Sequence, residues 1–302
     1  LTKNIRLGCG FNIAPMWHPL RLAEDYATAD ILTQGRVVFG VGRGYHTREV
    51  ETFGVPLLDQ PANRDLFEEQ VDIVFKSFEK DSFSHKGENY TIPPEVPYRG
   101  YTLEEITVVP RPVNRPVECW QPIQSATPRG LDFMAKHGMS GIIGGGSSEG
   151  GAMDKAVQGF RDAYARAGSE LQLGERLSIG FHYHIAETQE KAMAEVGAMY
   201  EENLKMFGPL RLVRALSDEQ LDWMSDSKVA PTADLPRVED AVKSGGVLAG
   251  PPDVIIEQLK DLERLYPGLD RVCVSHPMGA PQSVITEQLQ QFSEEVMPSF
   301  GK

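Results

Sequence analysis

Apolar runs and amphipathic segments alternate along most of the 302-residue chain. Short runs rich in Val, Ile, Phe or Cys predict buried strands, and longer segments with apolar residues along one face predict helices. The predicted strands are 5–11, 36–41, 117–124, 140–144, 177–185 and 270–275. One predicted helix has Pro19 in its first turn and is stopped by Gly35. A second carries Leu66, Phe67, Val71, Val74, Phe75 and Phe78 on one side, and further helices are predicted at 129–137, 152–167, 188–206, 251–265 and 281–297. Strands separated by helices of this length predict an α/β fold with a parallel sheet and right-handed crossovers.

Two segments interrupt this alternation. Residues 81–116 are rich in Pro, Gly and Tyr, which predicts a long excursion with short strands. Residues 208–248 have a mixed pattern, and we expect an irregular insertion there. No internal repeat is visible, and we expect one domain over residues 1–302.

The number of predicted strands leaves two architectures open. A doubly wound sheet and an eightfold barrel both consist of alternating strands and helices, but the barrel needs eight strands. Only six are predicted. For a barrel, either residues 208–248 contain a further strand or strands precede Leu1.

Composition and charge narrow the classes of function. The chain is 41% hydrophobic and 24% charged, which is typical of a globular protein. Its 30 Lys and Arg against 43 Asp and Glu give a net charge of −13, so nucleic acid and anionic membranes are poor partners. No apolar stretch approaches the roughly 18 residues of a membrane span, and no signal peptide is visible. Three widely spaced cysteines, Cys9, Cys119 and Cys273, each lie in an apolar run and predict reduced, buried thiols in a cytoplasmic protein.

A glycine-rich turn with an arginine ends the predicted strand 36–41. Its sequence, GVGRG at 40–44, does not match the dinucleotide fingerprint, because the third glycine comes one place early and no long helix follows. A buried turn that needs glycine for steric reasons is one interpretation. The other is a phosphate site, since Arg43 follows the carboxyl end of a strand, where α/β folds bind their ligands.

A second strand end also suits an anion. The sequence QSATPRG at 124–130 follows the predicted strand 117–124, and Pro128 suits the first turn of a helix. Ser125, Thr127 and the free amides near Arg129 would then face an anion at the helix start. Ordinary N-capping by Thr127 explains the same residues without a ligand. Two such strand ends in one chain favour a ligand that carries phosphate.

A metal site is not predicted. His182 and His184 share one face of a predicted strand, which is the spacing of a ligand pair. No third ligand lies near them in the sequence, and no HExxH motif occurs.

Several segments together resemble one family, the bacterial luciferase-like flavin monooxygenases. They include IRLGCGFNIAPMWHPLRLAED, ADILTQGRVVFGVGRGYHTREVETFGVP and VVPRPVNRPVECWQPIQSATP. The resemblance implies a TIM-type (β/α)8 barrel whose first two βα units are lacking in this chain, and we expect that the sequence is incomplete before Leu1. The family's usual catalytic histidine lies in that region, so the catalytic residue is unknown.

The resemblance also implies a cofactor site. Arg43 matches the arginine that holds the flavin phosphate, and Gly10-Phe11 falls at a bulge, often with a cis peptide, against the isoalloxazine ring. Asn12 matches a polar residue near the ring. The expected cofactor-binding residues are Gly10, Phe11, Asn12, Arg43, Gln124, Ser125, Thr127 and Arg129, although Arg129 stands where the family often has an acidic or small residue. Trp17, Tyr45 and His46 are candidates for the substrate pocket or for ordinary loop roles.

The implied activity is that of a two-component monooxygenase. A separate flavin reductase would supply reduced FMN, which reacts with O₂ to give a C4a-(hydro)peroxyflavin that oxygenates a small organic substrate. One alternative is hydride transfer with the deazaflavin F420, and another is a flavin-binding protein without turnover. We expect a cytoplasmic homodimer.

Overall fold

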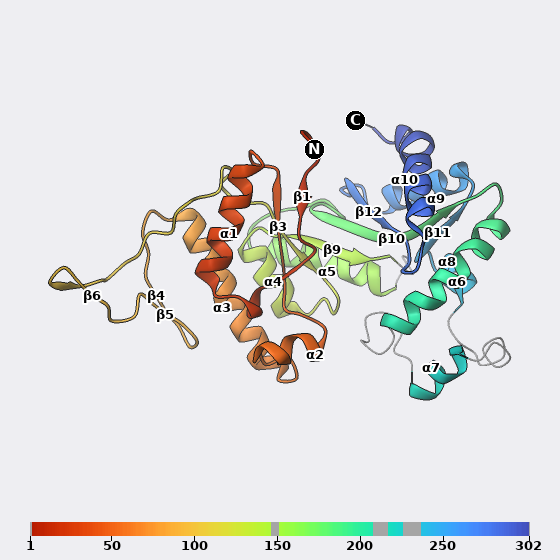
Figure 1. Cartoon of the computed structure of the whole chain (residues 1–302). Helices are drawn as coiled ribbons and strands as arrows, with labels where there is room; N and C mark the ends of the chain where they lie inside the picture. The colour runs from red at the N-terminus through yellow and green to blue at the C-terminus, as the bar shows by residue number, and fades with distance from the viewer. Residues whose placement is uncertain (1, 146–150, 208–216, 226–236, 302) are drawn as a thin grey trace. The chain divides into compact units, whose positions relative to one another are not determined.

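The computed structural model describes residues 2–145, 151–207, 217–225 and 237–301 (Figure 1). The chain divides into two compact units. The first comprises Leu1–Pro122 and His137–Ser140, and the second comprises Ile123–Lys136 and Gly141–Lys302.

The first unit is built on parallel strands around β3 (Val37–Gly42). Three strands pair with β3 in parallel: β1 (Leu7–Gly8), β2 (Asn12–Ile13) and β8 (Cys119–Pro122). Of the predicted strand 5–11, only Leu7–Gly8 forms a strand; a turn at Gly10–Phe11 follows, and β2 begins directly after it. Cys9 and Cys273 are exposed, so the prediction of buried thiols is wrong for both. A side chain at Gly40 would overlap the carbonyl oxygen of Cys9, so only glycine allows the two backbones to approach this closely.

Two long helices of the first unit, α1 (Pro19–Leu32) and α3 (Gln60–Glu79), pack against each other (Figure 1). Both begin with a capped first turn, since His18 Nδ1 accepts from Leu20 N at 3.3 Å and Asp59 Oδ1 accepts from Ala62 N at 3.1 Å. The rings of Tyr26, Phe39 and Phe78 meet with centroids 4.8–5.6 Å apart. These aromatic contacts fix α1 and α3 on β3. The remaining short helices are η1 (Ala14–Met16), α2 (Thr47–Val50) and η2 (Glu51–Phe53).

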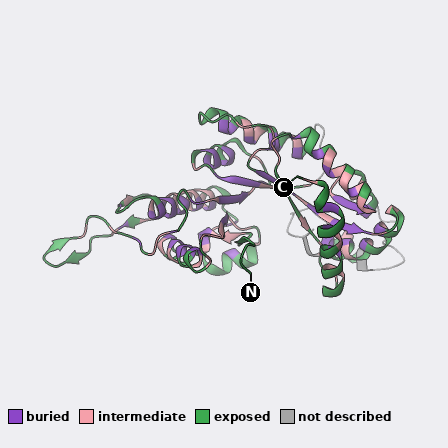
Figure 2. Cartoon of the chain, turned by 90° about the horizontal axis from the view of Figure 1, so that it is seen from above, coloured by how far each residue is buried: buried purple, intermediate pink, exposed green. Residues whose placement is uncertain are grey.

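The predicted excursion contains four short strands in two antiparallel pairs. They are β4 (His85–Lys86) with β5 (Thr91–Ile92), and β6 (Pro97–Tyr98) with β7 (Tyr101–Thr102). The β6–β7 ribbon is exposed along both strands (Figure 2). The β4–β5 hairpin is tied to α3 by Glu69, whose carboxylate accepts from the backbone amides of Asn89 and Tyr90 at 2.8 and 2.9 Å.

The second unit is arranged around the buried strand β10 (Leu177–Ile185). Three strands pair with it in parallel: β9 (Ser140–Gly144), β11 (Val247–Gly250) and β12 (Arg271–Ser275). Strand β11 was not among the predicted strands. It begins at Val247, at the end of the segment 208–248 in which an irregular insertion was expected and in which a barrel could have a further strand. Its four residues, VLAG, are too few and too small for a recognisable pattern.

Helices follow the strands of the second unit. They are α4 (Pro128–Lys136), α5 (Ala152–Arg166), α6 (Gln189–Phe207), α7 (Asp218–Ser225), α8 (Val238–Lys243), α9 (Pro252–Leu265) and α10 (Gln282–Gln291). The predicted helix 281–297 is divided, because a π-helical turn (Phe292–Val296) and a 3-10 turn (Met297–Ser299) follow α10. Side chains of α6 such as Val196 and Leu204 are fully buried in a cluster with Val247 and Ala249 of β11.

The prediction of parallel strands alternating with helices is confirmed within each unit. Among the described residues, no helix combines the length and apolar character needed to cross a bilayer.

Candidate functional site

Arg43 lies directly after β3 and is held by the start of α3. Its Nη1 donates to Asn63 Oδ1 and its Nη2 donates to Gln60 Oε1, both at 3.2 Å. Asn63 is fully buried and also donates from Nδ2 to the Arg43 carbonyl at 3.2 Å. Both the backbone and the guanidinium of Arg43 are therefore oriented by one amide side chain. The sequence interpretation missed Asn63, although a polar residue four positions before Phe67, on the apolar face of α3, was a usable signal.

The three glycine positions of the GVGRG turn differ in how strictly they require glycine. Gly40 has no room for a side chain, because of the carbonyl of Cys9. Gly44 has φ +90°, and a Cβ there would lie 2.6 Å from Val50 Cγ2. At Gly42 a Cβ would meet its nearest atom, Phe11 Cβ, at 3.5 Å, which is an ordinary contact. Backbone packing accounts for two of the three glycines, and these two fit the interpretation as a tight turn.

Gly10, Phe11 and Asn12 lie beside the same strand. The Gly10–Phe11 peptide bond is cis, as the resemblance implied for this bulge. Asn12 Nδ2 donates to the carbonyl of Gly40 at 2.9 Å, which joins the bulge to β3. The first unit thus brings Phe11, Asn12 and the strand that leads into Arg43 together.

The three candidates for a substrate pocket differ in their surroundings. Trp17 and Tyr45 are each 45% exposed. The Trp17 carbonyl accepts from Gln70 Nε2 at 2.9 Å, which is a structural bond. His46 is partly buried, and its Nδ1 has no hydrogen-bond partner in the part of the chain that the structure describes.

The second predicted anion site belongs to the second unit. Gln124, Ser125, Thr127 and Arg129 are all exposed, on the segment that leads into α4. Ala126 has φ +44°, and the Thr127 carbonyl accepts from Leu131 N at 3.0 Å, so the helix begins directly after this bend. The first backbone amides of α4 have no acceptor within the helix, which is the usual arrangement of an anion site.

The histidine pair of β10 has structural partners. His182 Nδ1 lies 3.2 Å from Ser275 Oγ, and burial lowers the pKa of His182. His184 Nε2 lies 2.9 Å from Glu195 Oε2. Across residues 2–145, 151–207, 217–225 and 237–301, no three His, Cys, Asp or Glu side chains are placed to hold a metal ion.

These features define a class: a parallel α/β protein with polar and cationic groups at the carboxyl ends of its strands. The chain belongs to the luciferase-like monooxygenase family, whose sequence profile matches residues 1–267. The resemblance identified from the sequence is thereby confirmed.

Relatives and solved structures agree with this assignment. The chain is 25% identical to the oxygenase component of a flavin-dependent trigonelline monooxygenase from Acinetobacter baylyi, over 100% of this chain and 78% of that protein. It resembles the oxygenating constituent of 3,6-diketocamphane monooxygenase from Pseudomonas putida, solved with FMN, with a TM-score of 0.72 and 19% identity over 99% and 81% of the two chains. An F420-dependent secondary alcohol dehydrogenase gives a TM-score of 0.69 and 18% identity over 100% and 81%. The fold is therefore shared by enzymes that use either cofactor.

Proposed function

We propose that the protein is the oxygenating component of a two-component flavin monooxygenase. It would take reduced FMN from a separate flavin reductase and use O₂ to oxygenate a small organic substrate. The main support is Arg43, which two side chains of α3 orient at the carboxyl end of β3. The trigonelline monooxygenase relative, described as an oxygenase component, supports the two-component arrangement.

The donors at the strand ends fit a flavin phosphate. Arg43 would form charge-assisted hydrogen bonds with it. In the second unit, considered by itself, Gln124, Ser125, Thr127 and the amides at the start of α4 are donors that suit a phosphate, and Arg129 adds a positive charge there. When bound, reduced flavin supplies two electrons and the atom at which oxygen is activated.

The protein's own residues would bind and orient the ring. The Gly10–Phe11 bulge would support the isoalloxazine ring, and Asn12, which donates to the Gly40 carbonyl, keeps the bulge in register with β3. Trp17, Tyr45 and His46 would border the substrate and limit the access of water. The catalytic residue is not assigned.

The second candidate is an F420-dependent hydride transfer, which the fold similarity to the alcohol dehydrogenase supports. Its phosphate-bearing cofactor could use the same Arg43 anchor, but it needs no O₂ and no flavin reductase. A flavin-binding protein without turnover is the third candidate.

One experiment separates the three candidates. Purified protein is titrated with FMN, reduced FMN and F420, and oxygen uptake is then followed with an FMN reductase, NADH and a panel of aldehydes, ketones and N-heterocycles. A flavin monooxygenase binds reduced FMN and forms a product labelled from ¹⁸O₂. A parallel anaerobic reaction contains F420 and a secondary alcohol in place of the flavin system, and oxidation of the alcohol there would contradict the proposal and support the second candidate. Flavin binding without any product over the panel would support the third.

A further inference from the structure

The β6–β7 ribbon exposes an apolar face. Tyr98 pairs with Tyr101 across the ribbon, and Leu103 N donates to the Val96 carbonyl at 2.9 Å, so these four side chains share one face. Val96, Tyr98 and Tyr101 are 38–56% exposed. In both views the ribbon extends away from α1 and α3 (Figure 1 and Figure 2). A two-stranded ribbon is marginally stable on its own, so an exposed apolar face of this kind favours contact with a partner.

The tip of the ribbon combines two aromatic rings with a positive charge. Arg99 and Gly100 have φ of +49° and +87°, which makes the tight two-residue turn between the strands. The rings of Tyr98 and Tyr101 meet edge to face with centroids 5.6 Å apart, and the Arg99 guanidinium lies 5.1 Å from the Tyr98 ring. Arg99 is exposed and has no carboxylate partner among the described residues. Tyrosine and arginine are enriched in protein–protein contacts, and this charge is open to a carboxylate of another molecule.

A second apolar surface of the first unit lies at the C-terminal ends of α1 and α3. The segment 109–113 crosses both ends, because Arg111 Nη2 donates to the Lys80 carbonyl after α3 and Val113 N donates to Asp30 Oδ2 of α1, each at 2.8 Å. Asp30 is buried, whereas the apolar residues at this end are 45–79% exposed. We call this surface the helix-end patch, and it consists of Ile31, Leu32, Val109 and Val113.

An exposed carboxylate lies beside the helix-end patch. Asp81 follows α3, and its Oδ1 accepts from Nη1 of Arg111, which stands between Val109 and Val113 in the chain. The Asp81 side chain is almost fully exposed, and no described residue besides Arg111 pairs with it. Its second oxygen is therefore open to another cation. Arg99 and Asp81 are complementary, and they are not bonded to each other within one chain.

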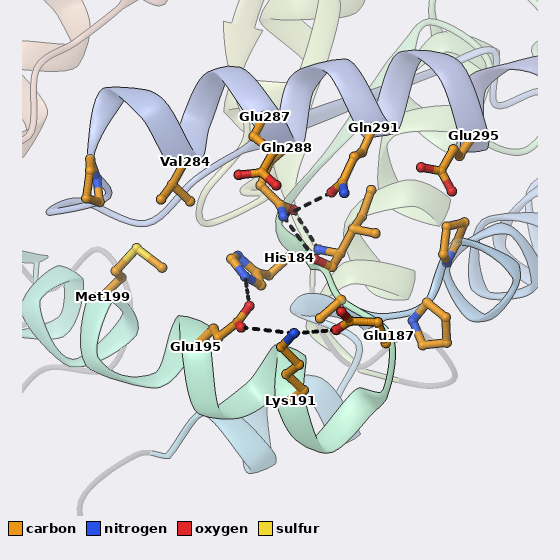
Figure 3. Close-up of a pocket in the computed structure, with 15 residues that line it drawn as sticks. His184, Glu187, Lys191, Glu195, Met199, Val284, Glu287, Gln288, Gln291 and Glu295 are labelled. Atoms are coloured by element: carbon orange, nitrogen blue, oxygen red, sulfur yellow. Dashed lines mark hydrogen bonds and ion pairs between the residues drawn. The ribbon is translucent and has the colours of Figure 1, made fainter.

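The net charge limits where two copies of the chain can meet. At −13 the copies repel each other on average, so a contact between them needs a surface with few carboxylates. The cavity of about 650 Å³ between α6 and α10 does not offer one, because four carboxylates and a single ammonium, that of Lys191, line it (Figure 3). The apolar face of the ribbon and the helix-end patch do, since aliphatic and aromatic side chains make up both.

The exposed area favours a reciprocal contact of ribbon with patch. Seven side chains of the two surfaces are about half exposed, and at roughly 150 Å² each they present about 500 Å² per copy. Two ribbons packed against each other would bury less than half of this. Two reciprocal contacts would bury about 1,000 Å² from these side chains alone, and their polar neighbours bring the total towards the roughly 1,200–2,000 Å² of a stable dimer.

We propose that the β6–β7 ribbon of one copy binds the helix-end patch of a second copy, and that the same contact forms in reverse about a two-fold axis. Tyr98 and Tyr101 then cover the partner's patch, and Arg99 pairs with Asp81 of the partner subunit. The homodimer expected from the sequence thereby gains a specific surface. The proposal is independent of the flavin chemistry above, and its test needs no cofactor.

Exchange of the two charges between copies tests the contact. Sedimentation equilibrium should show that the original protein dimerises at micromolar concentration. Arg99→Asp and Asp81→Arg should each weaken self-association at least tenfold, because like charges then meet at both contacts. An equimolar mixture of the two variants should dimerise within about threefold of the original affinity. In the mixed dimer the introduced aspartate meets the introduced arginine, and the native pair meets at the other contact.

A second pair of variants tests the apolar part of the contact. Leu32 and Leu58 are 79% and 77% exposed, so neither is needed for the fold. Leu32→Ser should weaken dimerisation at least threefold, whereas Leu58→Ser, outside both surfaces, should leave it unchanged. Arg48→Asp makes the same change of charge as Arg99→Asp at another exposed position and should also leave it unchanged. Circular dichroism checks the fold of every variant.

Three results would overturn the proposal. A monomeric original protein would mean that the two surfaces serve another partner or a further segment of chain. If Arg99→Asp and Asp81→Arg dimerise as well as the original protein, another surface forms the dimer. A mixture of the two variants that stays monomeric would mean that the two charges do not meet.

Discussion

At the scale of single residues, Arg43 is the anchor of the proposed cofactor site. Replacing Arg43 with Ala should weaken FMN binding by about 1.5–3 kcal/mol, because a charge-assisted contact to phosphate is lost. Fluorescence titration of FMN measures the change. Arg48→Ala is the matched control, since it removes the same charge from an exposed position five residues away. Unchanged FMN affinity in Arg43→Ala would contradict the anchoring role.

Asn63 is expected to act through Arg43 and not on the cofactor itself. Asn63→Ala removes the bond to the guanidinium and the bond to the Arg43 carbonyl, and it leaves a small cavity. The free energy of unfolding should fall by about 1–3 kcal/mol, and FMN should bind more weakly. Urea unfolding and FMN titration test the two effects. Asn114→Ala, which removes an exposed amide bonded to the Gly35 carbonyl, should leave FMN binding unchanged. Equal FMN affinity in Asn63→Ala and the original protein would show that Arg43 needs no such support.

These two residues also show how far the sequence predicts a site. Arg43 could be predicted because a charged residue directly after a buried strand stands out from its neighbours. Asn63 acts across a separation of 20 residues, and its role depends on how α3 packs beside β3. The pattern on α3 indicates only that position 63 is buried, not which group its amide will contact.

At the scale of elements, two glycines of β3 should respond very differently to the same substitution. Gly40→Ala places a Cβ on the Cys9 carbonyl and should lower the free energy of unfolding by about 3 kcal/mol. Gly42→Ala, two residues further on the same strand, meets only ordinary contacts and should change it by less than about 1 kcal/mol. Urea denaturation of both variants gives the comparison. A tolerated Gly40→Ala would mean that the bulge at residues 9–11 can move away from β3.

Glu69 accepts the hydrogen bonds that join α3 to the β4–β5 hairpin, and their contribution to the free energy of unfolding should depend on pH. Burial raises the pKa of Glu69, but hydrogen bonds from His85, Asn89 and Tyr90 outweigh it, so the pKa is lower in the folded protein than the ordinary 4.5. The folded state thus binds this proton less readily than the unfolded chain. The stabilisation is present above pH 4.5 and is lost as the pH falls through the lower, folded value.

Free energies of unfolding measured between pH 3 and 7 test this contribution of Glu69. Glu69→Gln should show a flatter fall below pH 4.5 than the original protein, whereas the exposed hairpin residue Glu88, replaced by Gln, should leave the profile unchanged. Parallel profiles for the original protein and Glu69→Gln would contradict the assigned role.

The bounds of the helices and strands show which features the pattern of apolar residues predicts and which it does not. The helices α1, α5 and α9 carry several turns of apolar spacing and begin within one residue of the predicted positions. Helix α3 was predicted from the apolar positions that start at Leu66, but it begins at Gln60. Strand β11 has four residues and is recognisable only by its register with β10. The division of the predicted helix 281–297 comes from a π-helical turn at Phe292–Val296, and apolar spacing does not distinguish such a turn from α-helix.

At the scale of the whole molecule, the family assignment rests on the order and spacing of many weak segments, and no one motif is sufficient. The GVGRG turn alone allowed a steric or a phosphate interpretation, and the structure assigns steric reasons to Gly40 and Gly44. FMN in preference to F420, the homodimer and the eightfold barrel remain predictions. The first depends on a bound cofactor, the second on a partner chain, and the third on eight strands, of which the sequence predicted six.

The single domain is a prediction that unfolding can test, since the chain divides into two compact units. Trp17 and Trp120 belong to the first unit and Trp223 to the second, so the variant Trp223→Phe reports on one unit and Trp17→Phe/Trp120→Phe on the other. If residues 1–302 form one cooperative domain, the fluorescence transition of each variant will coincide with its own circular-dichroism transition in urea. Within one variant the comparison is internal, so the stability lost on replacing the buried Trp120 does not affect it. Separate midpoints for fluorescence and circular dichroism in either variant would mean that the two units unfold independently, and the prediction of one domain would be wrong.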